Sequence, residues 1–164
     1  MRKNISIATL GSVILFIIMR WQGSTLKTTT SPRAIVDLEF ADSALRLHDL
    51  LVRWDITVVR MNIWLDFLFI IAYTIFLSLA AEFFATKWPV KSLFSRIGYF
   101  LAKLAYAAGI FDIAENLLML QSISGNYTES SLQLTFYCAS IKFILVALIF
   151  LYLIISLPLG FRKK

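Results

Sequence analysis

Four long apolar stretches dominate the sequence and restrict what it can fold into. They cover about residues 5–21, 61–86, 97–121 and 133–158, and a helix that crosses a membrane needs roughly 17–25 such residues. Inside a membrane every backbone N–H and C=O group must be paired within the protein, so spanning segments are helices or strands of closed barrels. Unbroken apolar runs, in place of short alternating ones, predict helices.

The composition agrees with a chain that is surrounded largely by lipid. Apolar residues make up 59% of the 164 residues and charged residues only 16%, whereas a soluble domain is about 45–50% apolar. We therefore predict an all-α integral membrane four-helix bundle, formed by residues 1–164 as one membrane domain. An extra amphipathic helix is expected between the first and second spans.

The first apolar stretch has two interpretations, a cleaved signal peptide or an anchor that stays in place. A signal peptide carries small residues at a cleavage site after its apolar core. This stretch ends instead at Met19, Arg20 and Trp21. We expect an uncleaved anchor, with the Trp21 ring at the membrane interface.

Residues 34–60 separate the first two spans and carry charges of both signs on an apolar background. Within them Phe40, Ala44, Leu47, Leu51 and Trp54 recur at steps of three and four, which is the period of an amphipathic helix. We predict a helix over about residues 40–56 that lies on the membrane surface or on the bundle. We expect this helix to pack through its apolar face and to expose its polar face to solvent.

Basic residues indicate how the spans are oriented. They gather at the N-terminus, in residues 87–103 and at the C-terminus: Arg2, Lys3, Lys87, Lys91, Arg96, Lys103, Arg162, Lys163 and Lys164. The loop of residues 122–132 has none, and the six basic residues of the long 20–60 loop are nearly balanced by acids. Because basic residues stay on the cytoplasmic side, we expect both termini to be cytoplasmic.

Several classes of function are disfavoured. The net charge of +6 comes from residues that flank apolar runs and not from a basic stripe, so no nucleic acid is expected as a partner. Cys138 is the only cysteine and His48 the only histidine, so we expect no Cys/His metal site and no cofactor. Motifs of metalloproteases, serine hydrolases and nucleotide-binding enzymes are absent, which favours a non-enzymatic role without excluding an enzyme.

The third span carries acids on a face that is otherwise lined by small residues. Ala102, Ala105, Gly109, Asp112 and Asn116 follow steps of three and four and so share one side of the helix. Small residues let a neighbouring helix approach closely. We therefore expect Asp112 and Asn116 to point into the bundle, with Glu115 one step to the side.

A lysine in the fourth span is at a depth where it can meet these acids. At about 1.5 Å per residue, Asp112 lies roughly 13 Å and Lys142 roughly 15 Å from the loop that joins the two spans. Asp66 in the second span reaches a similar level. We predict one polar cluster in the outer half of the bundle, made of Asp66, Tyr73, Asp112, Glu115, Asn116 and Lys142.

The cluster has two interpretations. Ionisable residues inside a membrane mark functional sites by default, but a buried ion-pair network that fixes helix register is the alternative. Three acids against one lysine leave an excess of negative charge. That excess favours a protonated carboxyl, a water-filled pocket, or a bound cation or amine.

Parts of the sequence resemble a family of small, uncharacterised bacterial four-span membrane proteins. The matching features lie in residues 35–75 and 105–121, about half of the chain: IVDLEFADS, Trp54, LDFLFIIAY (65–73) and FDIAEN (111–116). The resemblance implies an anchor, an outer amphipathic segment, three further spans and the bacterial inner membrane. It also implies a candidate site at Asp66, Tyr73, Asp112, Glu115 and Asn116, but no activity.

Three roles remain open. The first is an accessory or interaction subunit of a membrane assembly, with protein partners, or a homo-oligomer, among membrane lipids. The second is binding or transport of a lipid, amine, cation or proton through the polar cluster. The third is a small enzyme that acts on a lipid through Asp112 and Glu115. A cavity lined by the cluster would favour the second or third role, and close mutual packing the first.

Overall fold

The computed structural model describes residues 2–160, with the side chains of residues 3–158. These residues form helices and, within that range, no strand. In chain order the elements are α1 (Arg2–Gln22), the short 3₁₀ helix η1 (Gly23–Leu26), α2 (Val36–Glu39), α3 (Ala44–Leu51), α4 (Ile56–Ala85), α5 (Leu93–Ile123) and α6 (Glu129–Gly160). The predicted all-α bundle is confirmed.

Four of these helices are long and apolar enough to cross a membrane, which makes the chain a multi-pass membrane protein. The candidate spans are Lys3–Leu26, Ile56–Ala85, Leu93–Ile123 and Glu129–Pro158. Each begins two to five residues before the apolar stretch that predicted it. The difference arises because helices continue into polar residues until a capping side chain or a turn ends them.

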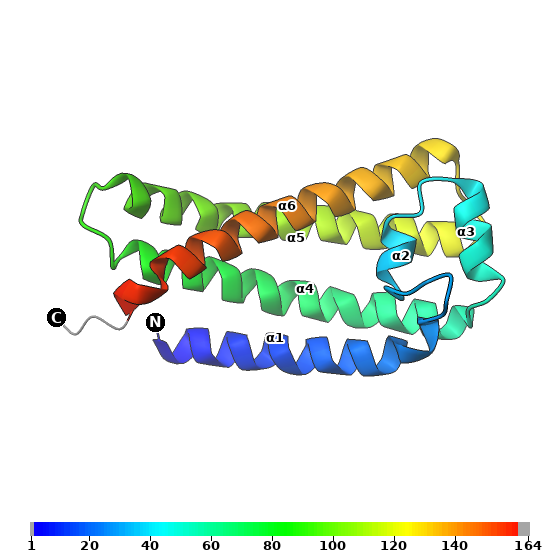
Figure 1. The fold of residues 1–164 in the computed structure, drawn as a ribbon, viewed down its shortest axis with the longest axis horizontal. Helices are drawn as coiled ribbons and strands as arrows, with labels where there is room; N and C mark the ends of the chain where they lie inside the picture. Colours follow the sequence, from blue (N-terminus) through cyan, green and yellow to red (C-terminus); the bar gives the residue numbers. More distant parts are fainter. Residues whose placement is uncertain (1, 161–164) are drawn as a thin grey trace.

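The helices α4, α5 and α6 form the body of the bundle, and α1 lies beside α4 (Figure 1). Consecutive spans run antiparallel, with α5 packed between α4 and α6. Only 6% of the most apolar part of the first span is buried, compared with 33–39% in the other three. The first span is therefore peripheral and leaves most of its surface to lipid.

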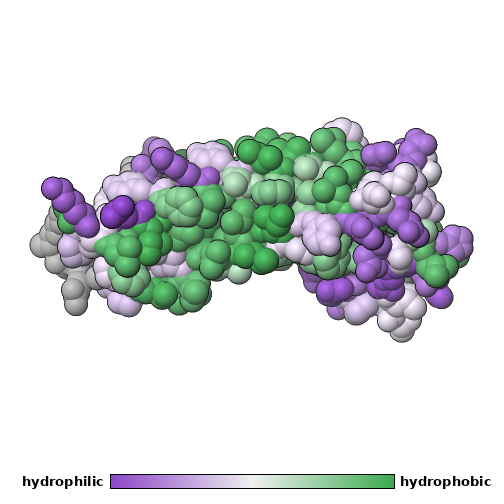
Figure 2. All heavy atoms as spheres, turned by 90° about the horizontal axis from the view of Figure 1, so that it is seen from above, coloured by the Kyte–Doolittle hydropathy of each residue, from purple (hydrophilic) through white to green (hydrophobic). Residues whose placement is uncertain are grey.

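The two ends of the bundle differ in structure. The elements η1, α2 and α3 gather at one end beside the turn between α5 and α6, and we call this the capped end. At the opposite end, the terminal end, α1 begins, α6 finishes and α4 turns into α5. Figure 2 shows hydrophobic side chains along the middle of the molecule and hydrophilic ones at both ends, most densely at the capped end.

The segment before α4 contains the predicted amphipathic helix, but this helix covers only Ala44–Leu51, so the predicted bounds of about residues 40–56 are wrong. The chain forms two shorter helices, α2 and α3, with extended backbone at Ser43. The Ser43 hydroxyl accepts a hydrogen bond from the backbone N–H of Arg46 (3.4 Å), which caps the start of α3. Asp55 caps α4 in the same way through the N–H of Thr57 (2.8 Å). The capping side chains therefore set where each helix begins, although the apolar residues keep a helical spacing across the whole segment.

Residues 23–55, which we call the cap segment, are fastened to the bundle by a small core. The carboxylate of Asp37 binds the guanidinium groups of Arg33 (3.0 Å) and Arg46 (3.5 Å). The indole N–H of Trp54 donates to the hydroxyl of Ser31 (3.2 Å). Apolar side chains of the segment pack with α5 in one buried cluster that includes Leu26, Leu38, Leu47, Leu50, Trp54, Met119 and Ile123. These contacts hold α2 in a fixed position over α5 and α6.

Near the terminal end, three spans approach one another at Gly98 of α5. A Cβ atom at this position would lie 2.7 Å from the Cβ of Ala85 in α4 and would overlap the hydroxyl of Tyr152 in α6. Because a Cβ atom cannot move without its backbone, only glycine allows this spacing of the three helices.

We predict that Gly98→Ala lowers the free energy of unfolding by about 1–3 kcal/mol, since overpacking forces backbone shifts. The measurement is unfolding of the purified protein in bicelles. Gly11→Ala in α1 is the control, because a Cβ atom there meets nothing within 4 Å and alanine favours a helix by about 1 kcal/mol over glycine. Equal effects of the two substitutions would contradict the close packing at Gly98.

Candidate functional site

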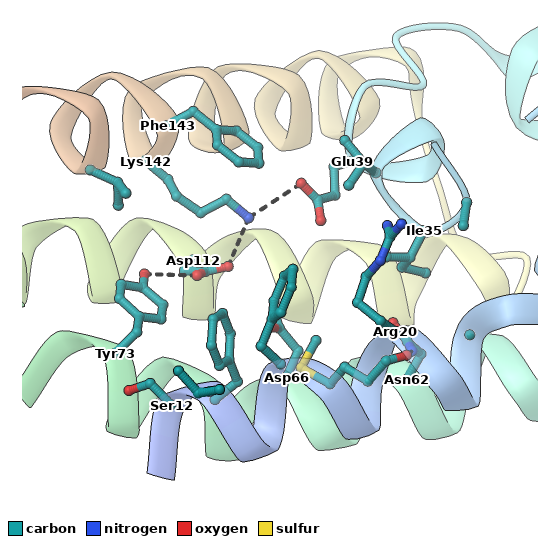
Figure 3. Close-up of a pocket in the computed structure, with 18 of the residues that line it drawn as sticks. Ser12, Arg20, Ile35, Glu39, Asn62, Asp66, Tyr73, Asp112, Lys142 and Phe143 are labelled. Carbon is teal, nitrogen blue, oxygen red and sulfur yellow. Dashed lines mark hydrogen bonds and ion pairs between the residues drawn. The ribbon is translucent and has the colours of Figure 1, made fainter. Parts of the chain in front are cut away.

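A cavity of about 540 Å³ lies between α1, α4 and α6, with α2 at its capped end and α5 behind it (Figure 3). Its volume falls in the range of about 300–1,000 Å³ that small-molecule sites occupy. Most of its lining is apolar and includes Val13, Phe16, Phe69, Phe76, Leu77, Val146 and Phe150. A few charged side chains also line it: Arg20, Lys27, Glu39, Asp66, Asp112 and Lys142.

Lys142 of α6 is the centre of the charged group. Its side chain is buried, and its Nζ donates to Asp112 (2.9 Å), Glu115 (3.0 Å) and Glu39 (3.4 Å). An ammonium group has three N–H bonds, so these carboxylates use all of its donors. Lys142 thus ties α2 and α5 to α6 and has no donor left for a ligand.

Asp112 of α5 accepts a hydrogen bond on each of its two carboxylate oxygens. The phenol O–H of Tyr73 in α4 donates to its Oδ2 (2.8 Å), while Lys142 donates to its Oδ1 (2.9 Å). The two bonds connect α4, α5 and α6 through a single buried carboxylate. Asp112 therefore serves as a junction between helices in addition to lining the cavity.

Asp66 of α4 differs from the other acids of the site. Its Oδ2 accepts a hydrogen bond from the side-chain amide of Asn116 (2.8 Å). Among residues 2–160 no cation lies within ion-pair distance of Asp66, although its carboxylate lines the cavity. The carbonyl oxygen of the Asn116 amide is buried and also lacks a partner in this part of the chain. The cavity wall therefore carries a carboxylate at Asp66 whose hydrogen-bond donor among the described residues is the Asn116 amide, with no cation beside it.

Glu39 enters the site from outside the spans. It ends α2, is buried, and reaches Lys142 across the top of the cavity. Burial raises the pKa of the Glu39 carboxyl above its ordinary value, and the nearby charges of Asp112 raise it further, while Lys142 opposes the shift. Glu39 brings the cap segment into direct electrostatic contact with the interior of the bundle.

The small-residue face of α5 positions the acids. Ala102, Ala105, Gly109, Asp112 and Asn116 are all buried, as their spacing predicted. A Cβ atom at Gly109 would lie 2.6 Å from the hydroxyl oxygen of Thr74, so α4 approaches α5 closely one turn before Asp112. This approach brings Tyr73 and Asp66 of α4 within reach of Asp112 and Asn116.

The structure brings together the six residues that the sequence singled out. Lys142 contacts both Asp112 and Glu115, and Tyr73 and Asp112 share a hydrogen bond. Asp66 and Asn116 form a neighbouring pair on the same two helices. Glu115 is completely buried and does not line the cavity, unlike Asp66, Tyr73, Asp112 and Lys142.

Sequence reasoning missed Glu39. The available signal was the alternation of Asp37 and Glu39 with apolar residues in IVDLEFADS, because acids inside an apolar segment need a partner. With Glu39 included, the site holds four carboxyl groups and one ammonium group, and Lys142 pairs with three of the four. Within residues 2–160 no group of three or more His, Cys, Asp or Glu side chains has the arrangement of a metal site.

No family model, no curated protein and no solved structure matches the chain.

We predict an energetic coupling between Asp112 and Lys142. In a double-mutant cycle with Asp112→Asn and Lys142→Met, the coupling in the free energy of unfolding should be about 0.5–3 kcal/mol, as for residues in contact. The control cycle combines Lys142→Met with Asp49→Asn, whose side chain is exposed on α3. Additive effects in both cycles would show that the buried pair does not form.

The pH dependence of stability should report the burial of Glu39. A carboxyl group whose pKa is raised by folding contributes stability that is full at low pH and is lost as pH rises through the raised value. We therefore expect Glu39→Gln to raise the thermal unfolding midpoint relative to wild type at neutral pH, and by less at acidic pH. Asp49→Asn is the control for losing a carboxylate at the same end. A Glu39→Gln advantage that grows on acidification would have the opposite sign to this account.

Proposed function

We propose that this protein binds a membrane amphiphile that carries a cationic amine. The amine lies against Asp66, and the apolar chain of the ligand occupies the part of the cavity between α1 and α6. The single observation that carries the proposal is the carboxylate of Asp66, which lines the cavity without an ion-pair partner among the described residues.

The charge balance of the site favours a cation as its ligand. A carboxylate in a poorly hydrated site is costly unless it is paired. Lys142 divides its three donors among Glu39, Asp112 and Glu115, so among the described residues no cation is left for Asp66, which depends on an added cation or on a proton. An ammonium group that reaches Asp66 supplies the missing charge and donors.

The shape of the cavity favours an amphiphile over a simple ion. Its apolar lining reaches from Phe16 of α1 to Phe150 of α6, and these two side chains remain 52% and 45% exposed. Residues that line a cavity and also face outward mark its opening, which here lies between the two spans. A ligand with an apolar chain can therefore enter from the lipid.

The other two roles receive less support. An accessory subunit held together by its polar cluster would need that cluster packed without a void, whereas Asp66, Asp112 and Lys142 line a cavity. An enzyme that used Asp112 and Glu115 would need both acids free, whereas Lys142 holds both, and Glu115 does not reach the cavity. Association with partner subunits or as a homo-oligomer stays a prediction.

We also propose the bacterial inner membrane as the location, with both termini in the cytoplasm. Lys3, Lys87, Lys91 and Arg96 lie at the terminal end of the bundle, and basic residues favour the cytoplasmic side. The basic tail of Arg162, Lys163 and Lys164 lies outside the described residues. This orientation puts the cap segment and the cavity in the outer half of the membrane.

The test compares three probes with the same apolar chain: dodecylamine, dodecanol and dodecanoate. Each is added to the purified protein in detergent at neutral pH, and the thermal unfolding midpoint is measured. Ligand binding to the folded state raises stability by about 2.7 kcal/mol at a hundredfold excess over Kd. We expect dodecylamine to raise the midpoint by several degrees and the other two probes to leave it nearly unchanged.

Two variants make the test specific for the site. In Asp66→Asn the shift caused by dodecylamine should fall to about half or less, because a tenfold loss of affinity removes about 1.4 of the 2.7 kcal/mol. In Asp49→Asn, where the acid is exposed on α3 and does not line the cavity, the shift should persist. Equal shifts with dodecylamine and dodecanol, or an undiminished shift in Asp66→Asn, would rule the proposal out.

A further inference from the structure

Two basic residues line the cavity at its capped end. Arg20 lies in the last turn of α1, and Lys27 follows η1. Both are exposed, and neither side chain makes an ion pair within the described part of the chain. Figure 3 shows the Arg20 guanidinium group directed into the cavity, beyond Glu39 on the side of the cap segment. The cavity thus has two unpaired cations on the capped side of its unpaired acid, Asp66.

The charges and apolar groups follow a fixed order along the cavity. On α4, Phe76 lies ten residues past Asp66, or roughly 15 Å toward the terminal end. On α1, Val13 lies seven residues before Arg20, or roughly 10 Å in the same direction. Asn62, one turn of α4 closer to the capped end than Asp66, donates to Met19 and Gln22, which flank Arg20 on α1. Glu39, Asp112 and Lys142 pair with one another, so the unpaired part of the lining passes from apolar to acidic at Asp66 and then to basic toward the capped end.

We infer that the ligand carries its amine between an apolar chain and a phosphate group, as in the phosphate ester of a long-chain amino alcohol. This inference rests on the proposed function and names the class of amphiphile. The chain lies against the apolar lining, the ammonium group meets Asp66, and the phosphate reaches Arg20 and Lys27.

The order of charges excludes the commoner arrangement of a zwitterionic phospholipid. In phosphatidylethanolamine the phosphate lies next to the chains and the amine beyond it. With its chains in the apolar part of the cavity, this lipid would place phosphate near Asp66 and its ammonium near Arg20. Like charges would then face each other at both positions, which opposes binding.

A phosphate suits the basic end of the cavity on chemical grounds. The guanidinium of Arg20 presents several N–H donors in a planar fork that matches phosphate oxygens, and the ammonium of Lys27 adds a second positive charge. Because free phosphate carries the same chemistry, the test must separate a phosphate attached to the amphiphile from one in solution.

The experiment measures apparent affinities of the full chain in nanodiscs by titration and native mass spectrometry. The probes are sphingosine, sphingosine with added inorganic phosphate, sphingosine 1-phosphate, and lysophosphatidylethanolamine of matched chain length. We expect sphingosine 1-phosphate to bind at least about tenfold more tightly than sphingosine, with inorganic phosphate adding nothing. Lysophosphatidylethanolamine should bind more weakly than sphingosine.

The variant Arg20→Gln/Lys27→Gln should abolish the advantage of sphingosine 1-phosphate over sphingosine, because the phosphate loses both of its cationic partners. Arg60→Gln is the matched control, because Arg60 is an exposed basic residue of α4 that does not line the cavity. Its affinities should equal those of wild type. Thermal unfolding midpoints of all variants establish that they are folded.

The outcomes separate the two proposals. If sphingosine binds but its phosphate ester binds no more tightly, or if the double variant keeps the advantage, the inference is overturned and the proposed function stands. If inorganic phosphate with sphingosine matches the ester, the phosphate need not belong to the amphiphile, and the inference is again overturned. If neither sphingosine nor its ester binds, both proposals fall.

Discussion

One buried ammonium group shared by three carboxylates holds this bundle together. Lys142 joins α6 to Asp112 and Glu115 of α5 and to Glu39 of the cap segment, and Asp112 extends the connection to α4 through Tyr73. Removing the lysine from such a group leaves uncompensated buried carboxylates, which costs several kcal/mol. The relative positions of three spans and the cap segment therefore depend on a single lysine.

The same network explains why a charged cavity can exist beside it. Because α1 packs at the edge of the bundle, it leaves space between itself and α6, and the network forms one wall of that space. The lysine compensates the acids that it touches, but Asp66 lies outside its reach. Under the proposed function, structural pairing and ligand binding are thus divided between neighbouring acids of one cluster.

The sequence predicted the spans and the main contacts because both follow from local patterns, which are the length of an apolar run and the three- and four-residue spacing of a helix face. Apolar runs identified four helices, and the spacing of Ala105, Gly109 and Asp112 showed which face of the third span is buried. The depth of Lys142 along its helix predicted its partner.

Two features of the structure were not predicted from the sequence. Glu39 contacts a residue 103 positions away, which no local pattern encodes. The break of the amphipathic segment depends on capping by Ser43 and Asp55, which compete with an unbroken apolar period.

The central claim is that the cavity holds a cationic amphiphile against Asp66. Native mass spectrometry of the protein extracted from the membranes in which it was made tests this claim most directly. The account predicts a bound amphiphile, with a basic amine in its fragmentation spectrum, on wild type and on Asp49→Asn but not on Asp66→Asn. The absence of any such species from wild type, or its equal retention by Asp66→Asn, would contradict the account.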